Sequence, residues 1–370
     1  MALAIAASLI ASCSSSKPER PAAPTSSTGG RAAAVVAALP DGCPARTLVP
    51  GAVVAFVARG RSWAVSPDDP ATLDCLFPTP DAGPFSFGPL GDRVALAGFE
   101  VRGVGDSRAS RPKGAVQPVY YSWSRPTGTT LIFTDGARHR LARADLGGSP
   151  ATRDITPLPG ATYGDMAYHP SGLAIGFVTS TPDGSELWMS TNQGANPDQL
   201  VHAVPGTTFG HIVFAHDGTG LYYSIDRRDG THALARYQLV SGDVAPGLWT
   251  GDAPVDDIVE LGGVPGVALT VGAGCAAHRA VFTSLDGSPG TPLSAGVDGP
   301  TSIVGRLDRD RFVVAVGGCG APSDLYVVHA GATAGPPVLL VRGVDAATLR
   351  QPEPTPPPPL PANLPRAQVA

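Results

Sequence analysis

Tyr168-His-Pro-Ser-Gly-Leu-Ala-Ile-Gly-Phe-Val-Thr179 is the stretch that decides the fold, because it joins an aromatic residue, a short Pro/Ser/Gly turn and an apolar strand. The same order returns in Phe214-Ala-His-Asp-Gly-Thr-Gly-Leu-Tyr-Tyr-Ser-Ile225. Weaker copies begin at Phe87 and Trp123. Each copy is too short to bury its own apolar face, so the copies must share a core with their neighbours. The repeat therefore predicts an all-β fold, a β-propeller.

Seven apolar strands follow a turn of this kind, and each predicts one blade. They lie near Phe56, Val94, Leu131, Ile175, Leu221, Val267 and Phe312. The last four steps are each about 45 residues, the length of a four-stranded blade. The first two steps are shorter, so we expect a compact or degenerate second blade, and six blades with one irregular member is the alternative. The first blade starts at its second strand, Val53–Ala58, and we expect Val344–Leu349 to supply its inner strand and close the ring.

The beginning of the chain resembles a bacterial lipoprotein signal. Residues 2–10 are an apolar run, and Ile10-Ala-Ser-Cys13 is similar to the lipobox of that family. The resemblance implies that residues 1–12 are a signal peptide and that Cys13 carries acyl chains such as palmitate at the cell membrane. No Lys or Arg precedes the run, whereas secretory signals usually have one, so we expect the natural start to lie upstream. The alternative is an ordinary N-terminus with a buried cysteine.

Two segments of biased composition flank the predicted propeller, residues 45–350. Residues 13–44 are rich in Ser, Pro, Thr, Gly and Ala, which predicts a flexible tether behind the lipidated cysteine. Residues 351–370 contain the run Pro356–Pro359 and predict a disordered, proline-rich tail with polyproline II character. Such a tail serves as a ligand for a proline-binding groove or, in the interpretation we prefer, as an exposed spacer.

The chain has five cysteines, and setting Cys13 aside leaves four. Four thiols allow three pairings. Cys275 and Cys319 occupy equivalent loop positions after apolar strands of adjacent repeats, so we expect them to pair, which leaves Cys43 for Cys75. Free buried thiols are the alternative. Disulfides persist in oxidising compartments, so this cysteine pattern agrees with export.

Four copies of the repeat resemble the TolB-like, or WD40-like, propeller repeat. That repeat reads apolar-Ser-Pro-Asp-Gly, an apolar strand, Asp-Gly and a short strand, and residues 168–190 follow it most fully. Residues 214–225, 55–75 and 123–145 look similar. Only the turn at Asp217 keeps the first Asp-Gly, and we expect no separate N-terminal domain of the TolB kind. The resemblance covers about residues 46–350 and implies a propeller used for protein or ligand contact in the cell envelope, without implying a role in the Tol system.

Composition and motifs argue against several classes of function. The net charge is −5, charged residues make up 15% of the chain, and only Lys17 and Lys113 are lysines. Nucleic acid is therefore not an expected partner, because phosphates need a basic face. The chain also lacks the Gly-x-Ser-x-Gly elbow, phosphate-binding loops and the His-Glu-x-x-His zinc helix. We predict no catalytic residue, metal site or cofactor, and we expect surface or structural roles for the scattered histidines His139, His202, His232, His278 and His329.

One set of polar residues is predicted to converge on the central channel. The inner strands of a propeller start around this channel, so equivalent positions form a ring. The position three residues before each turn aromatic gives Tyr120, Asp165 and His211, and the starts of two later inner strands give Asp256, Asp257 and Asp345. Tyr163 and Phe209 are expected to frame the site. Carboxylates and an imidazole at a channel mouth suit a cation or a small polar ligand; the alternative is a water-filled funnel of ordinary polar residues.

These features together lead to one hypothesis and two alternatives. We expect a lipid-anchored, extracytoplasmic propeller that acts as a non-catalytic binding or scaffold protein for an envelope partner. The alternative is a carbohydrate-active enzyme, a glycosidase or lyase, whose carboxylate pair lies at the channel mouth. A sensor ectodomain that reports ligand occupancy to a neighbouring membrane protein is a third possibility, which the sequence does not separate from the scaffold.

Overall fold

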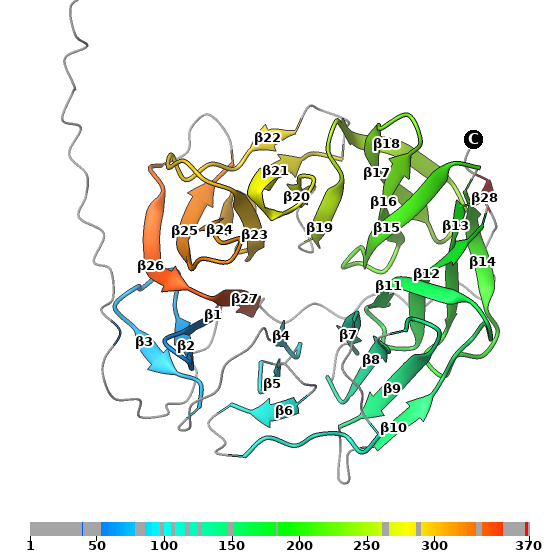
Figure 1. Ribbon diagram of the computed structural model, residues 1–370, viewed down its shortest axis with the longest axis horizontal. Coiled ribbons are helices and arrows are strands. Elements are labelled where there is room, and N and C mark those ends of the chain that lie inside the picture. The colour runs from blue at the N-terminus through cyan, green and yellow to red at the C-terminus, as the bar shows by residue number, and fades with distance from the viewer. Residues whose placement is uncertain are drawn as a thin grey trace, which may run out of the picture. The chain divides into compact units, whose positions relative to one another are not determined.

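The apolar strands that follow each turn become the second strands of separate sheets. In the computed structural model, residues 34–370 belong to one unit whose described part forms seven sheets arranged as a β-propeller (Figure 1). The predicted all-β class and the count of seven blades are confirmed. The structure describes residues 39, 53–77, 86–89, 91–96, 100–104, 108–114, 119–124, 128–135, 137–146, 151–182, 184–203, 205–260, 266–285, 290–330, 335–350 and 367–368.

The first three blades include the irregular one. From the channel outward, blade 1 contains β27 (Ala346–Arg350), β1 (Val53–Ala58), β2 (Arg61–Val65) and β3 (Leu73–Cys75). Blade 2 contains β4 (Ser86–Phe87), β5 (Arg93–Leu96) and β6 (Glu100–Gly103). Blade 3 contains β7 (Tyr121–Trp123), β8 (Thr130–Thr134), β9 (Leu141–Asp145) and β10 (Ala151–Asp154). Blade 2 has three described strands, and Ser110 forms an isolated bridge to Val101 of β6, at the place where the short spacing predicts a compact or degenerate blade.

Blades 4 to 7 are regular and follow one another along the chain. Blade 4 contains β11 (Thr162–Tyr168), β12 (Ala174–Thr181), β13 (Gly184–Thr191), β14 (Asp198–His202) and the short β28 (Ala367–Gln368). Blade 5 contains β15 (Thr207–Phe214), β16 (Gly220–Arg227), β17 (His232–Gln238) and β18 (Val244–Gly251). Blade 6 contains β19 (Val255–Glu260), β20 (Val267–Val271), the 3-10 turn η1 (Cys275–Ala277), β21 (Arg279–Thr283) and β22 (Thr291–Pro292). Blade 7 contains β23 (Thr301–Arg306), β24 (Arg311–Gly317), β25 (Ser323–His329) and β26 (Val338–Val344).

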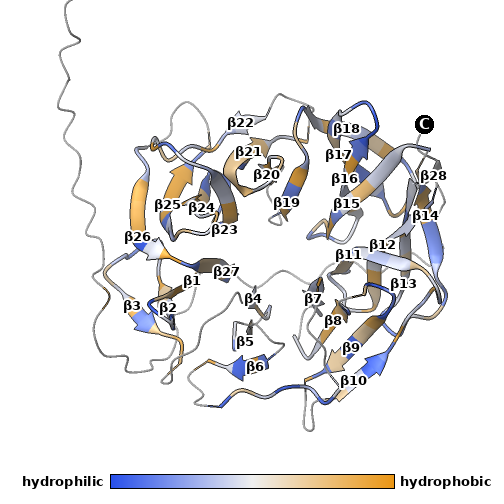
Figure 2. Cartoon of the chain, in the orientation of Figure 1, coloured by the Kyte–Doolittle hydropathy of each residue, from blue (hydrophilic) through white to orange (hydrophobic). Residues whose placement is uncertain are grey.

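The core lies between blades, as the short repeat requires. Each of the seven hydrophobic clusters in the described residues joins two neighbouring sheets; one of them, for example, packs Val57 of blade 1 with Val94 of blade 2. Second strands such as β1, β8 and β20 are buried at every position, because neighbours cover both faces. The rim strand β10, in contrast, is half-buried or exposed throughout and carries polar residues (Figure 2).

The ring is closed by the strand before the proline-rich tail. β27 pairs antiparallel with β1, with Val53 opposite Arg350 and Val57 opposite Ala346. The predicted closing strand is therefore confirmed, displaced by one or two residues along the chain. Closure covers the channel-side edge of β1, which would otherwise present unpaired backbone groups.

Part of the tail takes up regular structure. β28 lies parallel to β14, with Ala367 opposite Val201, and adds a fifth strand at the rim of blade 4. The expectation of a tail without secondary structure does not hold for these two residues, because an exposed rim strand offers free backbone groups for pairing. The remaining residues of the predicted tail, like the predicted signal peptide, Cys13 and the tether, fall outside the described residues apart from Leu39.

Disulfide bonding agrees with the cysteine pattern. Cys275 and Cys319 are bonded, and their Cα atoms lie 5.5 Å apart. This bridge links the loop after β20 in blade 6 to the loop after β24 in blade 7. Cys75 is also disulfide-bonded. Its predicted partner, Cys43, lies outside the described residues.

Polar side chains join neighbouring blades through the backbone of the inner strands. Ser122 Oγ of blade 3 accepts a hydrogen bond from the Tyr168 amide of blade 4 at 3.0 Å. Thr270 Oγ1 of blade 6 accepts one from the Ile303 amide of blade 7, also at 3.0 Å. Buried backbone amides need an acceptor. These side chains therefore satisfy inner-strand amides while they fix the blades to one another.

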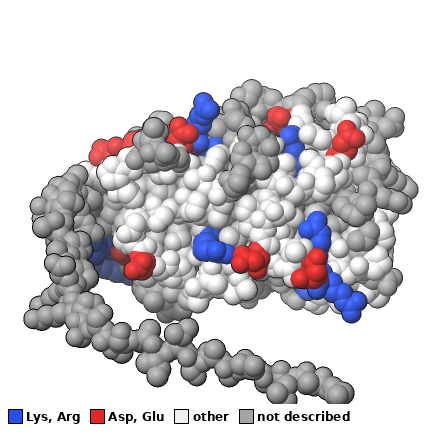
Figure 3. Space-filling view, turned by 90° about the horizontal axis from the view of Figure 1, so that it is seen from above, with Lys and Arg blue, Asp and Glu red and all other residues white. Residues whose placement is uncertain are grey.

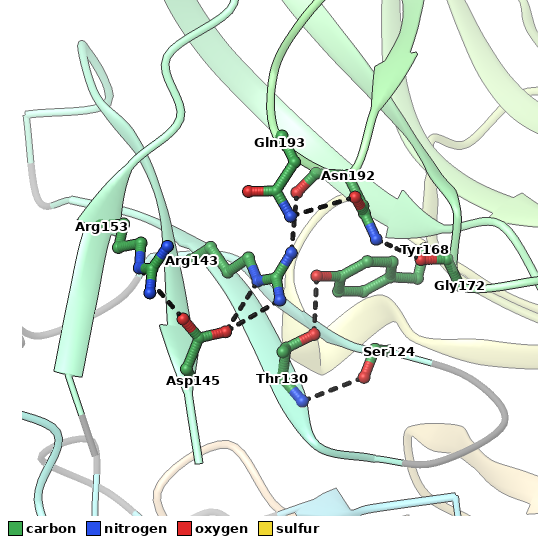
Figure 4. Close-up of polar contacts among 9 residues, drawn as sticks. All are labelled: Ser124, Thr130, Arg143, Asp145, Arg153, Tyr168, Gly172, Asn192 and Gln193. Atoms are coloured by element: carbon green, nitrogen blue, oxygen red, sulfur yellow. Dashed lines mark hydrogen bonds and ion pairs between the residues drawn. The ribbon is translucent and has the colours of Figure 1, made fainter. Parts of the chain in front are cut away.

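The joint between blades 3 and 4 is the fullest of these networks (Figure 4). Arg143 of β9 donates from Nε to Asp145 Oδ1 at 2.9 Å and reaches the Asn192 carbonyl of blade 4 at 3.5 Å. Arg153 lies 3.3 Å from the other oxygen of Asp145. The hydroxyls of Thr130 and Tyr168 are 2.9 Å apart across the same joint. Both carboxylate oxygens of Asp145 thus face a guanidinium group.

Candidate functional site

The inner strands of blades 4, 5 and 6 each break register near the channel. In β11 the break lies between Tyr163 and Met166, in β15 between Phe209 and Ile212, and in β19 between Val255 and Asp257. The residues within or at these breaks include Asp165, His211 and Asp257, which lie at equal steps of 46 residues. A β-bulge turns side chains out of the regular alternation. The three bulges therefore place one polar residue from each blade at an equivalent site.

Asp165 connects blade 4 to blade 5. Its Oδ1 accepts the Met166 amide at 2.7 Å, and its Oδ2 accepts the Ile212 amide at 3.1 Å. The same Oδ2 lies 3.4 Å from His211 Nδ1. Both carboxylate oxygens are therefore engaged by the protein itself.

His211 lies between this carboxylate and the acidic pair of blade 6. The hydrogen bond to Asp165 raises the pKa of His211 above its usual value, although desolvation opposes the shift. The charges of Asp165, Asp257 and Asp256 add to the increase. The imidazole is thus held toward its charged form by carboxylates from two blades.

Asp257 differs from Asp165 in having an oxygen to spare. Its Oδ1 accepts the Ile258 amide at 2.8 Å, and no other partner of this carboxylate occurs among the described residues. The side chain is exposed to solvent, yet the surrounding blades desolvate it enough to raise its pKa to about 6, an effect that the charge of His211 reduces. Asp257 therefore offers an incompletely satisfied acceptor.

Asp256 begins a second series of contacts that extends to blade 7. Its Oδ2 lies 3.2 Å from His278 Nε2, and His278 Nδ1 lies 3.1 Å from Ser302 Oγ. The His278 carbonyl also accepts the Thr301 amide at 2.8 Å, which ties the loop of η1 to β23. Asp256 remains 54% exposed, whereas His278 is 12% exposed. This series extends the polar ring from blade 6 to blade 7.

His278 and Ser302 were missed by sequence reasoning, which assigned His278 to the scattered histidines. The signal available in the sequence was its position three residues after Cys275, in the loop that the disulfide attaches to blade 7. A loop fixed at both ends can hold a side chain in a defined place.

The other predicted mouth residues do not join the cluster. Tyr163 is fully buried and its hydroxyl exchanges hydrogen bonds with the backbone of Leu158, while burial raises its pKa to about 12. Phe209 is 6% exposed and packs edge-on against Tyr223, so neither aromatic ring frames the mouth. The reason is the bulge, which directs the residue before the glycine into the core.

Tyr120 and Asp345 also lie apart from this cluster. Tyr120 packs against the core between blades 3 and 4. Asp345 is exposed just before β27, where its amide donates to the Val57 carbonyl at 2.8 Å. No described side-chain contact connects either residue to Asp257 or His211.

Metal binding and surface charge give two further observations. Among the described residues, no group of three or more His, Cys, Asp or Glu side chains is placed to hold one metal ion. Charged residues on the side of the molecule seen in Figure 3 occur singly or in small groups within an uncharged surface.

In the part of the chain that the structure covers, no helix is long and apolar enough to cross a bilayer.

Comparison with known proteins identifies the fold. No protein-family model and no curated protein match the chain. Among solved structures, a prolyl endopeptidase matches with a TM-score of 0.55 and 13% identity over 80% of this chain and 50% of that chain. An oligogalacturonate lyase in complex with manganese matches with a TM-score of 0.54 and 13% identity over 74% and 83%. TolB from Acinetobacter baumannii, whose repeat this sequence resembles, matches with a TM-score of 0.46 and 13% identity over 81% and 67%.

The similarities to the prolyl endopeptidase and the lyase agree with the β-propeller fold and leave the function to be argued from the site itself. The chain spans half the length of the prolyl endopeptidase that it matches. A common fold hosts many activities, so the chemistry must be argued from the side chains.

Proposed function

We propose that this chain is a lipid-anchored, extracytoplasmic β-propeller of the bacterial cell envelope that binds a partner protein without catalysing a reaction. In this proposal a positively charged side chain of the partner enters the channel mouth and contacts Asp256 and Asp257. The observation that carries it is the spare carboxylate oxygen of Asp257, next to the exposed carboxylate of Asp256. Charge-assisted hydrogen bonds from Lys or Arg suit such acceptors.

Two independent features support the proposed location. The lipobox-like sequence ending at Cys13 supplies the anchor, and the disulfide between Cys275 and Cys319 favours an oxidising compartment. The Cys13→Ser variant is expected to move from the membrane fraction to the soluble fraction, with Cys43→Ser as the control. Equal membrane retention of Cys13→Ser and wild type would contradict the anchor while leaving the binding site open to its own test.

The binding role is tested by recovering partners from detergent-solubilised cell envelope. The Asp256→Asn/Asp257→Asn double variant is expected to lose a protein that wild type retains. Asp252→Asn is the matched control, because Asp252 is 92% exposed and precedes the same strand, outside the cluster. Retention of the same partners by the double variant would contradict a role for the mouth. A soluble organic cation that competes with the partner would instead assign the site to a small ligand.

The enzyme alternative needs a pair of carboxylates that act as acid and base. Asp165 and Asp257 were the candidate pair, but both oxygens of Asp165 are occupied by inner-strand amides and His211. A carboxylate that holds two blades together is poorly suited to exchange protons with a substrate. This difference favours binding over catalysis, and turnover of a polysaccharide that disappears in Asp257→Asn would reverse the choice.

A further inference from the structure

A cleft of 630 Å³ lies at the seam between blades 4 and 5, and none of its lining residues belongs to the channel mouth. Blade 4 contributes the end of β12 and the following hairpin, including Ser180. Blade 5 contributes the start of β15, with Thr208, and the end of β16, with Asp226, Arg227 and Arg228. The volume falls in the range of small-molecule sites, about 300–1,000 Å³.

Two arginines line this cleft, Arg227 and Arg228. Neither Arg227 nor Arg228 forms a side-chain hydrogen bond or an ion pair with any described residue. Elsewhere in the described chain, some guanidinium groups form ion pairs with neighbouring carboxylates: Arg143 pairs with Asp145, and Arg311 pairs with Asp68 at 2.6 Å. Two adjacent cationic donors are therefore available within one cleft.

One oxygen of the carboxylate that lines the same cleft is engaged by a histidine. Asp226 Oδ1 lies 2.6 Å from His232 Nδ1, across the first pair of residues in the β16–β17 hairpin. This contact pairs one oxygen of Asp226 with the histidine, and neither arginine pairs with Asp226. The donors of Arg227 and Arg228 therefore remain free for an anion from solution.

The hairpin that carries the arginines is braced by hydrogen bonds across its turn. Asp229 Oδ1 accepts both the amide and the hydroxyl of Thr231, at 2.9 and 2.7 Å. The Arg227 amide donates to the Thr231 carbonyl at 2.9 Å. Because its backbone is fixed, the hairpin loses less conformational entropy when a ligand binds. Ser180 of β12 and Thr208 of β15 also line the cleft and add two neutral hydroxyl donors, and neither hydroxyl has a partner among the described residues.

We propose that this cleft binds a small organic anion through its carboxylate or phosphate group. Arg227 and Arg228 bind the anionic oxygens, because a guanidinium group matches both groups with two parallel hydrogen bonds. Ser180 and Thr208 bind further oxygens of the same molecule. The site is separate from the channel mouth, so it stands whether or not the partner-binding proposal is correct.

Isothermal titration calorimetry at fixed low ionic strength tests the site, with inorganic phosphate and citrate as the two probes. We expect saturable binding of at least one probe, and the tighter probe identifies the class of anion. Each of Arg227→Ala and Arg228→Ala should weaken binding about tenfold, and the double variant should abolish it. Arg342→Ala is the matched control, because Arg342 is exposed and lies on blade 7.

Two further variants separate a built site from general electrostatics. Arg227→Lys/Arg228→Lys keeps both charges but loses the planar fork, so we expect affinity between those of wild type and the double alanine variant. Asp226→Asn should bind the anion as tightly as wild type or more tightly. Equal loss in Arg342→Ala, unchanged binding in the double alanine variant, or loss of binding in Asp226→Asn would each overturn the proposal. Circular dichroism and thermal unfolding confirm that every variant is folded.

Discussion

The joint between blades 3 and 4 and the channel mouth at blade 6 contain the same kinds of polar residue, but these residues have different roles in the two places. At the joint, both oxygens of Asp145 face a guanidinium group, and the hydroxyls of Thr130 and Tyr168 meet each other. At the mouth, Asp257 uses one oxygen for its own strand and keeps the other without a described partner. Satisfied polar groups stabilise a fold, whereas an unsatisfied one marks a place where a ligand gains most.

The largest expected effect comes from a satisfied joint, the one between blades 6 and 7. Arg306 is fully buried between the rings of Phe282 and Phe312 and donates to the carbonyls of Gly266, Asp308 and Arg309. Arg306→Ala leaves these acceptors unpaired and a cavity behind, so urea unfolding should show a loss of about 3–4 kcal/mol.

Arg309→Ala is the control for this variant, because Arg309 is exposed and contributes only its carbonyl. A loss below about 1 kcal/mol in Arg306→Ala would show that the joint is not a source of stability.

Removing the disulfide should have a similar or slightly smaller effect. Cys275 and Cys319 are 44 residues apart in sequence and connect two blades next to the mouth. The double serine variant is expected to lose about 2–4 kcal/mol of unfolding free energy. Denaturant unfolding with and without a reductant checks this expectation: the reductant should destabilise wild type more than the variant, and equal effects would contradict it.

Asparagine substitutions at Asp165 and Asp257 are expected to change the stability of the fold in opposite directions. Asp165→Asn weakens an acceptor of two amides and should cost about 1–2 kcal/mol. Asp257→Asn removes a carboxylate whose pKa is raised to about 6, so its charged form at pH 7 costs stability and the variant should be more stable. Thermal unfolding of the two variants at pH 7 measures both effects, and destabilisation by Asp257→Asn would remove the distinction between joint and mouth.

Two histidines provide the smallest and sharpest test, because their pKa values shift in opposite directions. His169 is fully buried and spans from Ser171 to the Gly218 carbonyl of blade 5, and burial lowers its pKa. The contribution of His169 to folding stability is present above pH 6.5 and is lost as the pH falls through the lowered pKa of the folded state. His211 has a raised pKa, so its contribution is present below pH 6.5 and is lost as the pH rises through the raised value.

Urea unfolding of His169→Gln and His211→Gln between pH 5 and pH 8 compares them. The destabilisation caused by His169→Gln should grow with pH, and that caused by His211→Gln should shrink. Parallel pH profiles for the two variants would contradict the assignment of His169 to a joint and His211 to the mouth.

The sequence predicted the architecture well because the relevant signals are local. All seven second strands lie where the apolar runs occur, and Cys275 pairs with Cys319 as their equivalent loops indicate. The mouth was predicted only in part. A β-bulge shifts the register of a strand pair, and the alternation of inward and outward side chains along the sequence does not show where a bulge occurs. Asp165 and His211 were predicted from their spacing to a turn aromatic and Asp257 from the start of an inner strand, whereas the burial of Tyr163 and Phe209 was not predicted.

Long-range pairing explains the remaining differences. His278 contacts Asp256 and Ser302, which lie 22 and 24 residues away along the chain, and the nearby Cys275 is the one local sign that its loop is held in place. The pairing of β28 with β14 joins residues more than 160 positions apart, which a composition argument about a proline-rich tail does not address.

The pairing of β1 with β27 has a consequence for biosynthesis. One of the first strands to be made must wait for one of the last, so a nascent propeller keeps an open seam while the intervening blades are produced. A chain that stops short of Ala346 would retain that seam permanently.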